Sequence, residues 1–516
     1  MNVLRVAELG GHREVQPLQI KGDTHLAVSS IEALAMAMDR LLHDAQEYFI
    51  LCWTPCPRRI AADERPDSAS WSFLVRHQPP LIQGWYSLRH RNVAILICYS
   101  ERPPFFSSRL QWLDTNSPAK GKRLPSYFSA APRSDATVLD VVGAGIVGCV
   151  TANYFARRGF RVRMWDAADR IMSGASGNPH AVLFSQLSPF DQIQPRFYLS
   201  SLYAAIQSLE EMQREYPEIG FFSQCGVFTR SSHGEMWERV LHDRVSTNFM
   251  QATQRGLLLP KAGVLDPMTL GRLLTSHPAI ELSLNTPISN IRVSNTRTYL
   301  QTKRGEISTM LVVLCNAYAV KDFSLCNGLA LKKSVGQLSY TLKKRYENDR
   351  VLSAEAYVTP YWNGFQCLGA TYRQKESSLD VLESENQENI QRVAQAFPLL
   401  EGAADAQMYG RVGIRAQSNN FLPIIGPIPD VQFYRTHYQR LRHGMLSSPQ
   451  YPDARYVPGL FVNTGHGSKG FSQAWIAAQL LYAQIRNLPP PVDWQLYQSL
   501  HPARFTVKRL RKGEAI

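Results

Sequence analysis

The sequence predicts an α/β protein, α+β overall, in which a Rossmann-like dinucleotide-binding domain is interrupted by an antiparallel-sheet substrate domain. Three observations support this fold class. Residues 138–166 contain an apolar run, a Gly-rich turn, a helical pattern and a second β-branched run. A second Gly-rich turn, at 463–470, again lies between a strand-like run and a helical pattern. Short alternating runs, typical of antiparallel strands, fill much of the region between them.

The first turn has the GxGxxG pattern of a dinucleotide-binding loop. Gly143 allows the tight turn, Gly145 lets the backbone approach a pyrophosphate, and Gly148 lets the helix pack closely on the strand. The N-terminus of the following helix offers free N–H groups to the phosphates. Asp166 stands near the expected spacing for a carboxylate that binds ribose hydroxyls. The alternative is a Gly-rich turn in another kind of α/β unit. The predicted cofactor-binding residues here are Gly143, Ala144, Gly145, Ile146, Val147, Gly148 and Asp166.

The second turn favours FAD over a nicotinamide cofactor. In a nicotinamide dehydrogenase, the chain would more often complete the nucleotide-binding domain before entering the substrate domain, and would not come back to it with a second Gly-rich turn so late in the sequence. A helix N-terminus aimed at the pyrimidine end of a flavin stabilises the negative charge that develops there on reduction. Lys469 would add a positive charge beside the flavin or a substrate carboxylate. The alternative is a tight turn into a surface helix. The predicted cofactor-binding residues are Gly465, His466, Gly467, Ser468, Lys469 and Gly470, with Ser176, Gly177 and Asn178 from the Gly/Ser/Asn cluster at 173–179.

The sequence offers fewer candidate residues for binding the substrate than for binding the cofactor. Arg415 follows Arg411 in a segment that we expect to form a turn, where an arginine would clamp a carboxylate with two hydrogen bonds. A surface ion pair is an equal alternative for Arg415. Tyr361, Tyr372 and Gln337 lie on predicted strands and either face the pocket or belong to the core. Lys469 and Arg415 are therefore the predicted catalytic residues.

Composition narrows the classes of partner. The 516 residues carry 56 Lys and Arg against 42 Asp and Glu, a net charge of +14, which suits a polyanion, an anionic membrane surface or a merely basic enzyme. The eight cysteines are scattered and mostly in apolar runs, so no metal site is expected. No signal peptide and no run of 18 apolar residues is visible, which predicts a cytoplasmic protein without a membrane span.

The predicted organisation has three parts. Residues 1–134 form a small α/β piece with a helix at 30–45, strands at 48–53, 93–99 and 110–113, and a linker at 116–135. Residues 135–502 form the oxidoreductase part, with cofactor-binding segments at about 135–225 and 405–490 and a substrate domain at about 226–404. Helices are expected at 197–216, 235–254 and 471–486. Residues 503–516 form a basic tail that is a candidate polyanion contact through Arg504, Lys508, Arg509, Arg511 and Lys512.

Several motifs resemble those of the MnmC family, the bifunctional tRNA 5-methylaminomethyl-2-thiouridine biosynthesis proteins. The similar segments are 138–148, GASGNPHAVLFSQLSP at 174–189, AYVTP at 356–360, LGATY at 368–372, RVGIRAQSNNFLPIIGPIPD from 411 and GHGSKGFSQA from 465. They match the C-terminal, FAD-dependent half of the family, a relative of glycine and D-amino-acid oxidases, over about residues 136–512. The resemblance implies a D-amino-acid-oxidase-like fold, FAD as cofactor and a wobble uridine of tRNA as substrate.

The N-terminal piece departs from the family, whose N-terminal half is an S-adenosylmethionine-dependent methyltransferase. Residues 79–85 and 112–120 resemble its later segments, but Thr115 and Asn116 stand where the family has Gly-Phe, and no Gly-rich donor loop lies upstream. We expect a degenerate and inactive remnant. In the oxidoreductase half, His180 replaces a frequent Gln and Asn420 a common Asp, which puts fine substrate contacts in doubt.

The first hypothesis is thus an FAD-dependent, tRNA-modifying oxidoreductase that acts on a CH–NH group. As the resemblance implies, it would convert 5-carboxymethylaminomethyl-(2-thio)uridine at the wobble position to 5-aminomethyl-(2-thio)uridine by oxidative removal of the carboxymethyl group. Two alternatives stay open: an FAD-dependent oxidase of free amino acids or amines with the same fold, and a non-catalytic tRNA-binding relative.

Overall fold

The chain divides into two compact units. The first comprises residues 1–124 with 239–247, and the second comprises residues 125–238 with 248–516. The structure, a computed structural model, describes the backbone of seven strands within residues 1–124 and, beyond them, residues 125–516 apart from 189–191, 231–248, 295–296, 374–377, 404–405, 445–450, 488–489 and 493.

The first unit contains two small sheets in its described backbone, ordered β1-β3-β2 and β4-β5-β7-β6. The strands predicted at 48–53 and 93–99 are confirmed as β4 and β7, whereas the helix predicted at 30–45 and the strand at 110–113 lie outside the described residues. That this unit is a methyltransferase remnant stays a prediction. Its strands are β1 (Arg5–Ala7), β2 (Pro17–Ile20), β3 (Asp23–Ala27), β4 (Tyr48–Leu51), β5 (Trp71–Arg76), β6 (Gly84–His90) and β7 (Val93–Tyr99).

The second unit is built on a six-stranded sheet ordered β16-β9-β8-β20-β27-β26. Neighbours are parallel from β16 to β27, and β26 runs antiparallel to β27. Strands that are covered on both faces are apolar nearly throughout, as β20 is, with three buried residues. The strands are β8 (Val138–Val142), β9 (Arg161–Trp165), β16 (Ile280–Ser283), β20 (Val312–Leu314), β26 (Ile424–Pro429) and β27 (Tyr456–Thr464).

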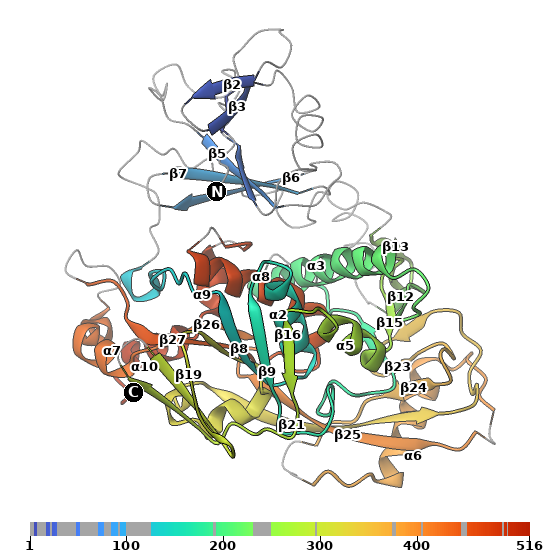
Figure 1. Cartoon of the computed structure of the whole chain (residues 1–516). Coiled ribbons are helices and arrows are strands. Elements are labelled where there is room, and N and C mark those ends of the chain that lie inside the picture. The colour runs from blue at the N-terminus through green and yellow to red at the C-terminus, as the bar shows by residue number, and fades with distance from the viewer. Residues whose placement is uncertain are drawn as a thin grey trace. The chain divides into compact units, whose positions relative to one another are not determined.

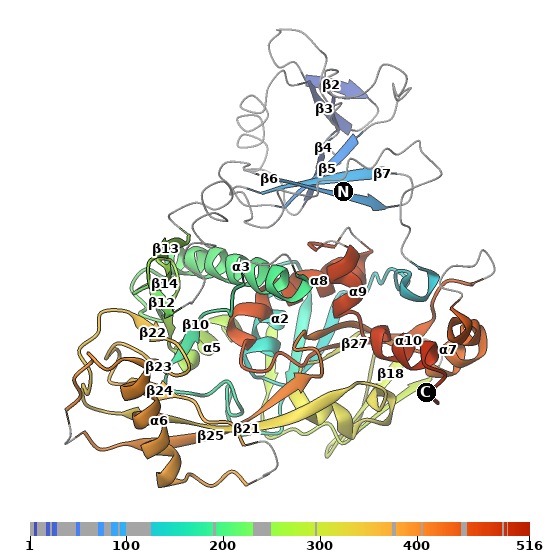
Figure 2. The same ribbon diagram turned by 180° about the vertical axis from the view of Figure 1, so that it is seen from behind.

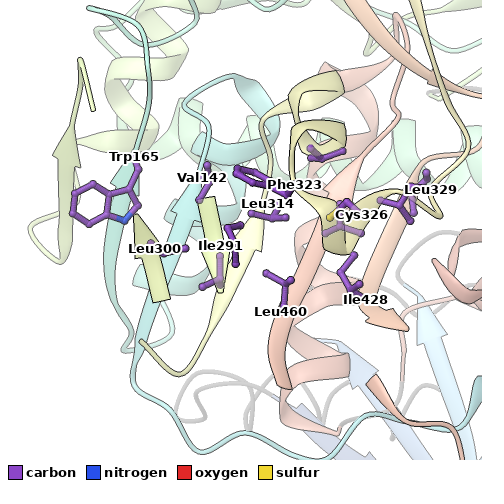
Figure 3. Close-up of a cluster of buried hydrophobic side chains, with 14 residues drawn as sticks. Val142, Trp165, Ile291, Leu300, Leu314, Phe323, Cys326, Leu329, Ile428 and Leu460 are labelled. Carbon is purple, nitrogen blue, oxygen red and sulfur yellow. The ribbon is translucent and has the colours of Figure 1, made fainter. Parts of the chain in front are cut away.

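One face of this sheet is covered by a three-stranded antiparallel sheet, β17 (Asn290–Ser294), β18 (Arg297–Thr302) and β19 (Gly305–Thr309). Figure 3 shows the apolar cluster between the layers, in which Ile291 and Leu300 meet side chains of the central strands such as Leu314 and Leu460. Successive side chains of a strand point to opposite faces, so Val313, also buried, must face the other layer.

That other layer is helical. α2 (Ile146–Ala156) packs on β8 and β9 and against α5 (Pro267–Thr275) and α8 (Gly470–Arg486), and α3 (Ile193–Glu215) packs on α8 (Figure 1). α3 buries Leu202, Ile206 and Leu209, which share one face at helical spacing. The helices predicted at 197–216 and 471–486 are therefore confirmed as α3 and α8.

The substrate-domain prediction corresponds to an eight-stranded sheet ordered β13-β14-β12-β22-β23-β24-β21-β25. All its neighbouring pairs are antiparallel except β12 and β22, and α6 (Glu383–Ala396) packs on β21, β24 and β25. Its strands are β12 (Val227–Arg230), β13 (Gln251–Thr253), β14 (Gly256–Leu259), β21 (Leu331–Thr341), β22 (Val351–Ser353), β23 (Tyr357–Val358), β24 (Gln366–Gly369) and β25 (Tyr409–Ser418).

Shorter elements complete the described part of the second unit. A small sheet ordered β10-β15-β11 joins β10 (Ala181–Leu183), β11 (Phe222–Ser223) and β15 (Gly263–Leu265). The remaining helices are η2 (Ser126–Phe128), η3 (Ala317–Asp322), η4 (Ser324–Cys326), α7 (Val431–His437), η5 (Gln439–His443), α9 (Trp494–Leu500) and α10 (Ala503–Arg511).

The structure differs from the sequence predictions in four places. Of the helix predicted at 235–254, residues 235–248 lie outside the described part, and Gln251–Thr253 is the strand β13. The turn expected around Arg411 and Arg415 is the long strand β25. The basic tail at 503–516 begins with the packed helix α10. The domain boundaries stay a prediction, but β16 and β20, from within the predicted substrate domain, belong to the central sheet.

Candidate cofactor and substrate site

The first Gly-rich turn joins β8 to α2 and can only be made by glycine at two positions. Gly143 has φ +108°, and a Cβ there would lie 2.8 Å from the backbone of Cys315 and Asn316. A Cβ on Gly148 would collide with the carbonyl oxygen of Gly143. Gly145 caps α2 without any side-chain hydrogen bond. The turn is therefore lined by backbone, as a pyrophosphate needs.

Asp166 anchors this turn. Its Oδ2 accepts a hydrogen bond of 2.5 Å from the backbone N–H of Ala144, and its Oδ1 accepts one of 2.8 Å from Ala168. The carboxylate has further lone pairs, so ribose hydroxyls could still donate to it. That Asp166 binds the ribose stays a prediction. Its hydrogen bonds to the turn give it a second, structural role.

The Gly/Ser/Asn cluster at 173–179 lies against the start of α2. The backbone N–H of Ile146 donates to Oγ of Ser176 at 3.1 Å, which brings that hydroxyl to the helix N-terminus. Met172 donates from its backbone N–H to the carbonyl of Ala144. The predicted residues Ser176, Gly177 and Asn178 thus stand beside the first turn.

Arg411 fixes this cluster from the neighbouring sheet. Its guanidinium donates to the carbonyl oxygens of Ser173 and Gly174 at 2.9 and 2.7 Å, and to Oδ1 of Asn178 at 3.0 Å. A Cβ on Gly413 would lie 3.3 Å from Cα of Ala175, so β25 passes close to the loop. Sequence reasoning missed this role of Arg411. A glycine inside a strand is the signal that marks such a close approach.

The second Gly-rich turn joins β27 to α8 and meets the first one. Gly465 and Gly467 have φ of +79° and +59°, and a Cβ on Gly470 would lie 3.2 Å from Ile146. Gly467 also donates from its backbone N–H to Ala416 of β25 at 2.7 Å. The structure therefore brings together the three predicted segments, 143–148, 173–178 and 465–470.

The side chain of His466 belongs to the core of this turn. Its ring nitrogens lie 3.0 and 2.9 Å from amide oxygens of Gln473 and Asn463, and burial lowers its pKa to about 4. The ring is therefore neutral at pH 7. Any contact of His466 with the cofactor would come from its backbone.

Lys469 stands at the N-terminus of α8 and is half-buried. Its Nζ lies 4.9 Å from the ring centroid of Tyr198, whose hydroxyl donates to the carbonyl of Phe421. Burial lowers the pKa of the Lys469 ammonium below the ordinary lysine value. The residue is thus a partly desolvated cation within the site region, unlike a lysine on a surface turn.

Arg415 lies two pleats beyond Arg411 on the same face of β25. Its Nη1 is buried and, among the described residues, has no hydrogen-bond partner. Its guanidinium carbon lies 4.9 Å from the ring centroid of Tyr372, which is 56% exposed. A buried guanidinium N–H without a partner is costly, so this group is suited to an anionic ligand.

Tyr357 is a further site residue that was not singled out, although it lies in the AYVTP segment. It is on β23, and a Cβ on the neighbouring Gly369 would lie 3.3 Å from its hydroxyl. Burial is the main cause that raises the pKa of Tyr357, whereas the charge of Arg415 lowers it. The hydroxyl is therefore protonated at neutral pH and able to donate.

Several other candidates have structural partners instead. Gln337 is buried and bonds to α6 through Asn386, and Tyr361 donates to the carbonyl of Leu342. His180 contacts Thr359 and the carbonyl of Trp362, and burial lowers its pKa to about 4. The Oδ1 of Asn420 accepts from Ser418 and Arg504.

Neither a metal centre nor a membrane span is found in the part of the chain that the structure describes. No group of three or more His, Cys, Asp or Glu side chains there could hold a metal ion. None of its helices combines the length and the apolar character needed to cross a membrane.

Comparison with known proteins agrees with this geometry. Relatives include the tRNA 5-methylaminomethyl-2-thiouridine biosynthesis bifunctional proteins MnmC of Chromobacterium violaceum and Pseudomonas fluorescens. The first is 29% identical over 432 residues, covering 77% of this chain and 64% of the relative. The second is 28% identical over 428 residues, covering 78% and 64%. The chain thus spans less than two thirds of the length of these curated relatives.

Solved structures share the fold. Glycine oxidase from Geobacillus kaustophilus has a TM-score of 0.52 at 18% identity, over 70% of this chain and 98% of that enzyme. L-proline dehydrogenase from P. horikoshii has a TM-score of 0.54 at 15% identity, over 75% and 100%. The model of the family described as DAO, FAD dependent oxidoreductase, matches residues 141–484. The chain, a homologue of MnmC, therefore belongs to the DAO family of FAD dependent oxidoreductases and uses FAD as its cofactor.

Proposed function

We propose that this chain removes the carboxymethyl group from 5-carboxymethylaminomethyl-(2-thio)uridine at the wobble position of tRNA and leaves 5-aminomethyl-(2-thio)uridine. The kinship with MnmC and the net charge of +14 support a tRNA substrate. One observation carries the chemistry of the reacting group: the buried, unpartnered Nη1 of Arg415 in the site region.

Arg415 would bind the carboxylate of the substrate. Its planar guanidinium matches the two oxygens of a carboxylate, and the proposed substituent ends in that group. The Tyr372 ring beneath the guanidinium limits its movement, and the protonated hydroxyl of Tyr357 supplies a neighbouring donor. Binding would complete the hydrogen bonds of Nη1 and position the carbon between nitrogen and carboxylate.

Oxidation of the substrate carbon and hydrolysis of the product would involve the cofactor, Lys469 and water. When bound, FAD would supply the hydride acceptor for oxidation of the substrate carbon between the amine and the carboxylate. The cation of Lys469, with the N-terminus of α8, would stabilise the negative charge that develops during this transfer or bind the carboxylate. No general base is needed when the amine arrives neutral. Water then hydrolyses the resulting substrate imine, which releases glyoxylate and leaves the aminomethyl group on the uridine.

The test is nucleoside analysis of tRNA that carries the carboxymethylaminomethyl group, before and after incubation with the protein. We expect that nucleoside to decrease, with equal appearance of the aminomethyl nucleoside and glyoxylate. Under anaerobic conditions, the same tRNA should reduce the flavin before these products appear. Glycine and N-methylglycine serve as comparison reductants, because a carboxylate-binding arginine would also suit a free amino acid.

Variants connect the reaction to Arg415. Arg415→Met should retain FAD and lose most flavin reduction by tRNA, whereas Arg415→Lys should retain part of it. The exposed Arg292, on the β17 strand, provides a control through Arg292→Met. Fast reduction by glycine with none by tRNA would replace the proposal with an oxidase of free amino acids. A protein with FAD that no tRNA reduces would contradict the proposal outright.

A further inference from the structure

A second charged region lies on three helices outside the site region. α7, η5 and α10 pack together, with α10 contacting both of the others, and α7 and α10 are adjacent in both views (Figures 1 and 2). Their inner side is apolar and includes the buried side chains of Tyr434, Tyr438, Leu441, Val507 and Leu510. The three helices therefore form one packed cluster.

The outer side of this cluster is strongly basic. Asp430, Asp453 and Glu514 are the acidic side chains of these helices and their flanks in the described residues, and Asp430 already caps α7. We name the exposed cations of this side the basic face: Arg435, Arg440, Arg442, Arg455, Lys508, Arg511 and Lys512.

The structure also separates surface cations from structural ones. Arg504 of α10 points inward, where its guanidinium donates to the carbonyls of Leu422, Pro423 and Leu500. Arg509 is half-buried and bonds to the carbonyl of Ala515. Both were candidate polyanion contacts in the sequence, but neither side chain is exposed, so neither belongs to the basic face.

Three members of the basic face carry most of the argument. Among the described residues, no carboxylate lies within ion-pair distance of Arg442, Arg455 or Lys508. Arg455 is oriented by the Phe433 ring, 4.8 Å from its guanidinium carbon. Exposed cations that gather on packed helices, with few acidic side chains among them, attract an anionic ligand with several charges.

We propose that the basic face is a docking surface for the phosphate backbone of tRNA. The proposal rests on the proposed function, since it assumes that tRNA is the substrate. An anionic membrane would also match the charge, but a helix that lies on a membrane inserts an apolar face. The apolar side chains of α7, η5 and α10 are instead buried in the protein, which favours the RNA.

The test compares two triple variants of the full chain. Arg442→Gln, Arg455→Gln and Lys508→Gln are combined in one, and Arg297→Gln, Lys303→Gln and Arg304→Gln, exposed on β18 and the turn that follows it, in the matched control. We expect the first variant to weaken tRNA binding at least about tenfold at low salt and to reduce the slope of log Kd against log salt by about 2, since each lost phosphate contact removes roughly 0.7–0.9. The control should keep the wild-type slope.

Further measurements separate the possible failures. FAD content and flavin reduction at saturating tRNA should match the wild type, and a third variant with Arg442→Lys and Arg455→Lys should bind like the wild type. An unchanged slope in the first variant would overturn the docking surface while leaving the proposed function intact. A wild type that does not bind tRNA would overturn both. Binding to phosphatidylserine vesicles, but not to tRNA, would assign the basic face to a membrane.

Discussion

At the scale of single residues, the first turn depends on the absence of a side chain at Gly148. A Cβ there would collide with the carbonyl oxygen of Gly143, a backbone atom that cannot move without opening the turn. We expect Gly148→Ala to lower the FAD content of the purified protein to below about a tenth of the wild-type value, because the pyrophosphate loses its backbone donors.

The ratio of flavin to protein absorbance measures this effect. Gly220→Ala is the matched control, since nothing lies within 4 Å of a Cβ at Gly220. It should keep full FAD content. Equal FAD content in both variants would show that the turn at 143–148 does not hold the cofactor.

Lys469 gives a prediction about rate and pH. If its cation stabilises the developing negative charge, Lys469→Met should retain FAD and slow flavin reduction by tRNA at least about tenfold. Burial lowers the pKa of Lys469, so the wild type should lose this cation, and with it rate, at a lower pH than an ordinary lysine would. Lys469→Arg keeps its charge to higher pH and should move the alkaline decline upward.

Single-turnover reduction, followed by the loss of flavin absorbance between neutral and alkaline pH, distinguishes the possibilities. An unchanged rate in Lys469→Met would assign the lysine to packing against Tyr198 alone. If the reduction rate of Lys469→Arg declined at the same pH as that of the wild type, the decline would belong to another titrating group.

At the scale of elements, periodicity and glycine spacing were enough to predict much of the site. The turns at 143–148 and 465–470 were found because dinucleotide binding demands glycines next to a helix, and α3 and α8 because their apolar residues repeat at helical spacing. Neither signal reveals contacts between distant segments. Arg411 can hold residues 173–178 because β25 passes beside that loop. Gly413 marks a close approach, but no local pattern says which segment approaches it.

The errors have the same origin. The segment around Arg411 and Arg415 was expected to form a turn, but its Gly413 pairs with Gly336 inside the ladder between β21 and β25. Residues 503–516 were expected to form a basic tail, although Ala503, Thr506, Val507 and Leu510 have the spacing of one helix face and are buried. β16 and β20 lie within the predicted substrate domain but join the central sheet, and neither short segment indicates in the sequence which sheet it joins.

The attachment of α6 to the substrate sheet allows a stability prediction. Arg373 and Glu385 form a bidentate ion pair with side-chain exposures of 6% and 11%. Removing one partner of a buried pair costs about 3–5 kcal/mol, so Arg373→Met should lower the free energy of unfolding of this unit by that amount. The double variant Arg373→Met/Glu385→Leu should recover much of the loss, because no buried charge is left unpaired.

The pair also sets a pH dependence. The hydrogen bonds from Arg373 lower the pKa of Glu385 below the ordinary glutamate value. Its contribution is therefore complete above about pH 4.5 and is lost as the pH falls through the lower, folded-state pKa. Chemical denaturation between pH 3 and 7 should show that the free energy of unfolding falls at acid pH in the wild type and not in the double variant. An identical acid dependence in both proteins would show that the pair does not cause the loss of stability.

At the scale of the whole molecule, the two units are expected to differ in function. The family match and the Gly-rich turns belong to the second unit, whereas the relatives named MnmC are bifunctional and longer than this chain. Residues 1–134 have no Gly-rich donor loop, and Thr115 and Asn116 replace the family's Gly-Phe after Asp114. On this prediction, these residues offer no Gly-rich backbone surface to a methyl donor.

We therefore expect the full chain to bind FAD and not S-adenosylmethionine. Isothermal calorimetry with S-adenosylmethionine should show no heat of binding at concentrations up to about 1 mM, a limit that corresponds to roughly 4 kcal/mol of binding free energy. The tRNA product should correspondingly accumulate as the aminomethyl nucleoside, with no methylaminomethyl nucleoside when the donor is added. The yellow holoprotein is its own control, because retained FAD shows that the second unit is folded in the same sample. Micromolar affinity for the donor, or donor-dependent methylation of the tRNA, would show that the first unit has kept the activity that its sequence has been predicted to lack.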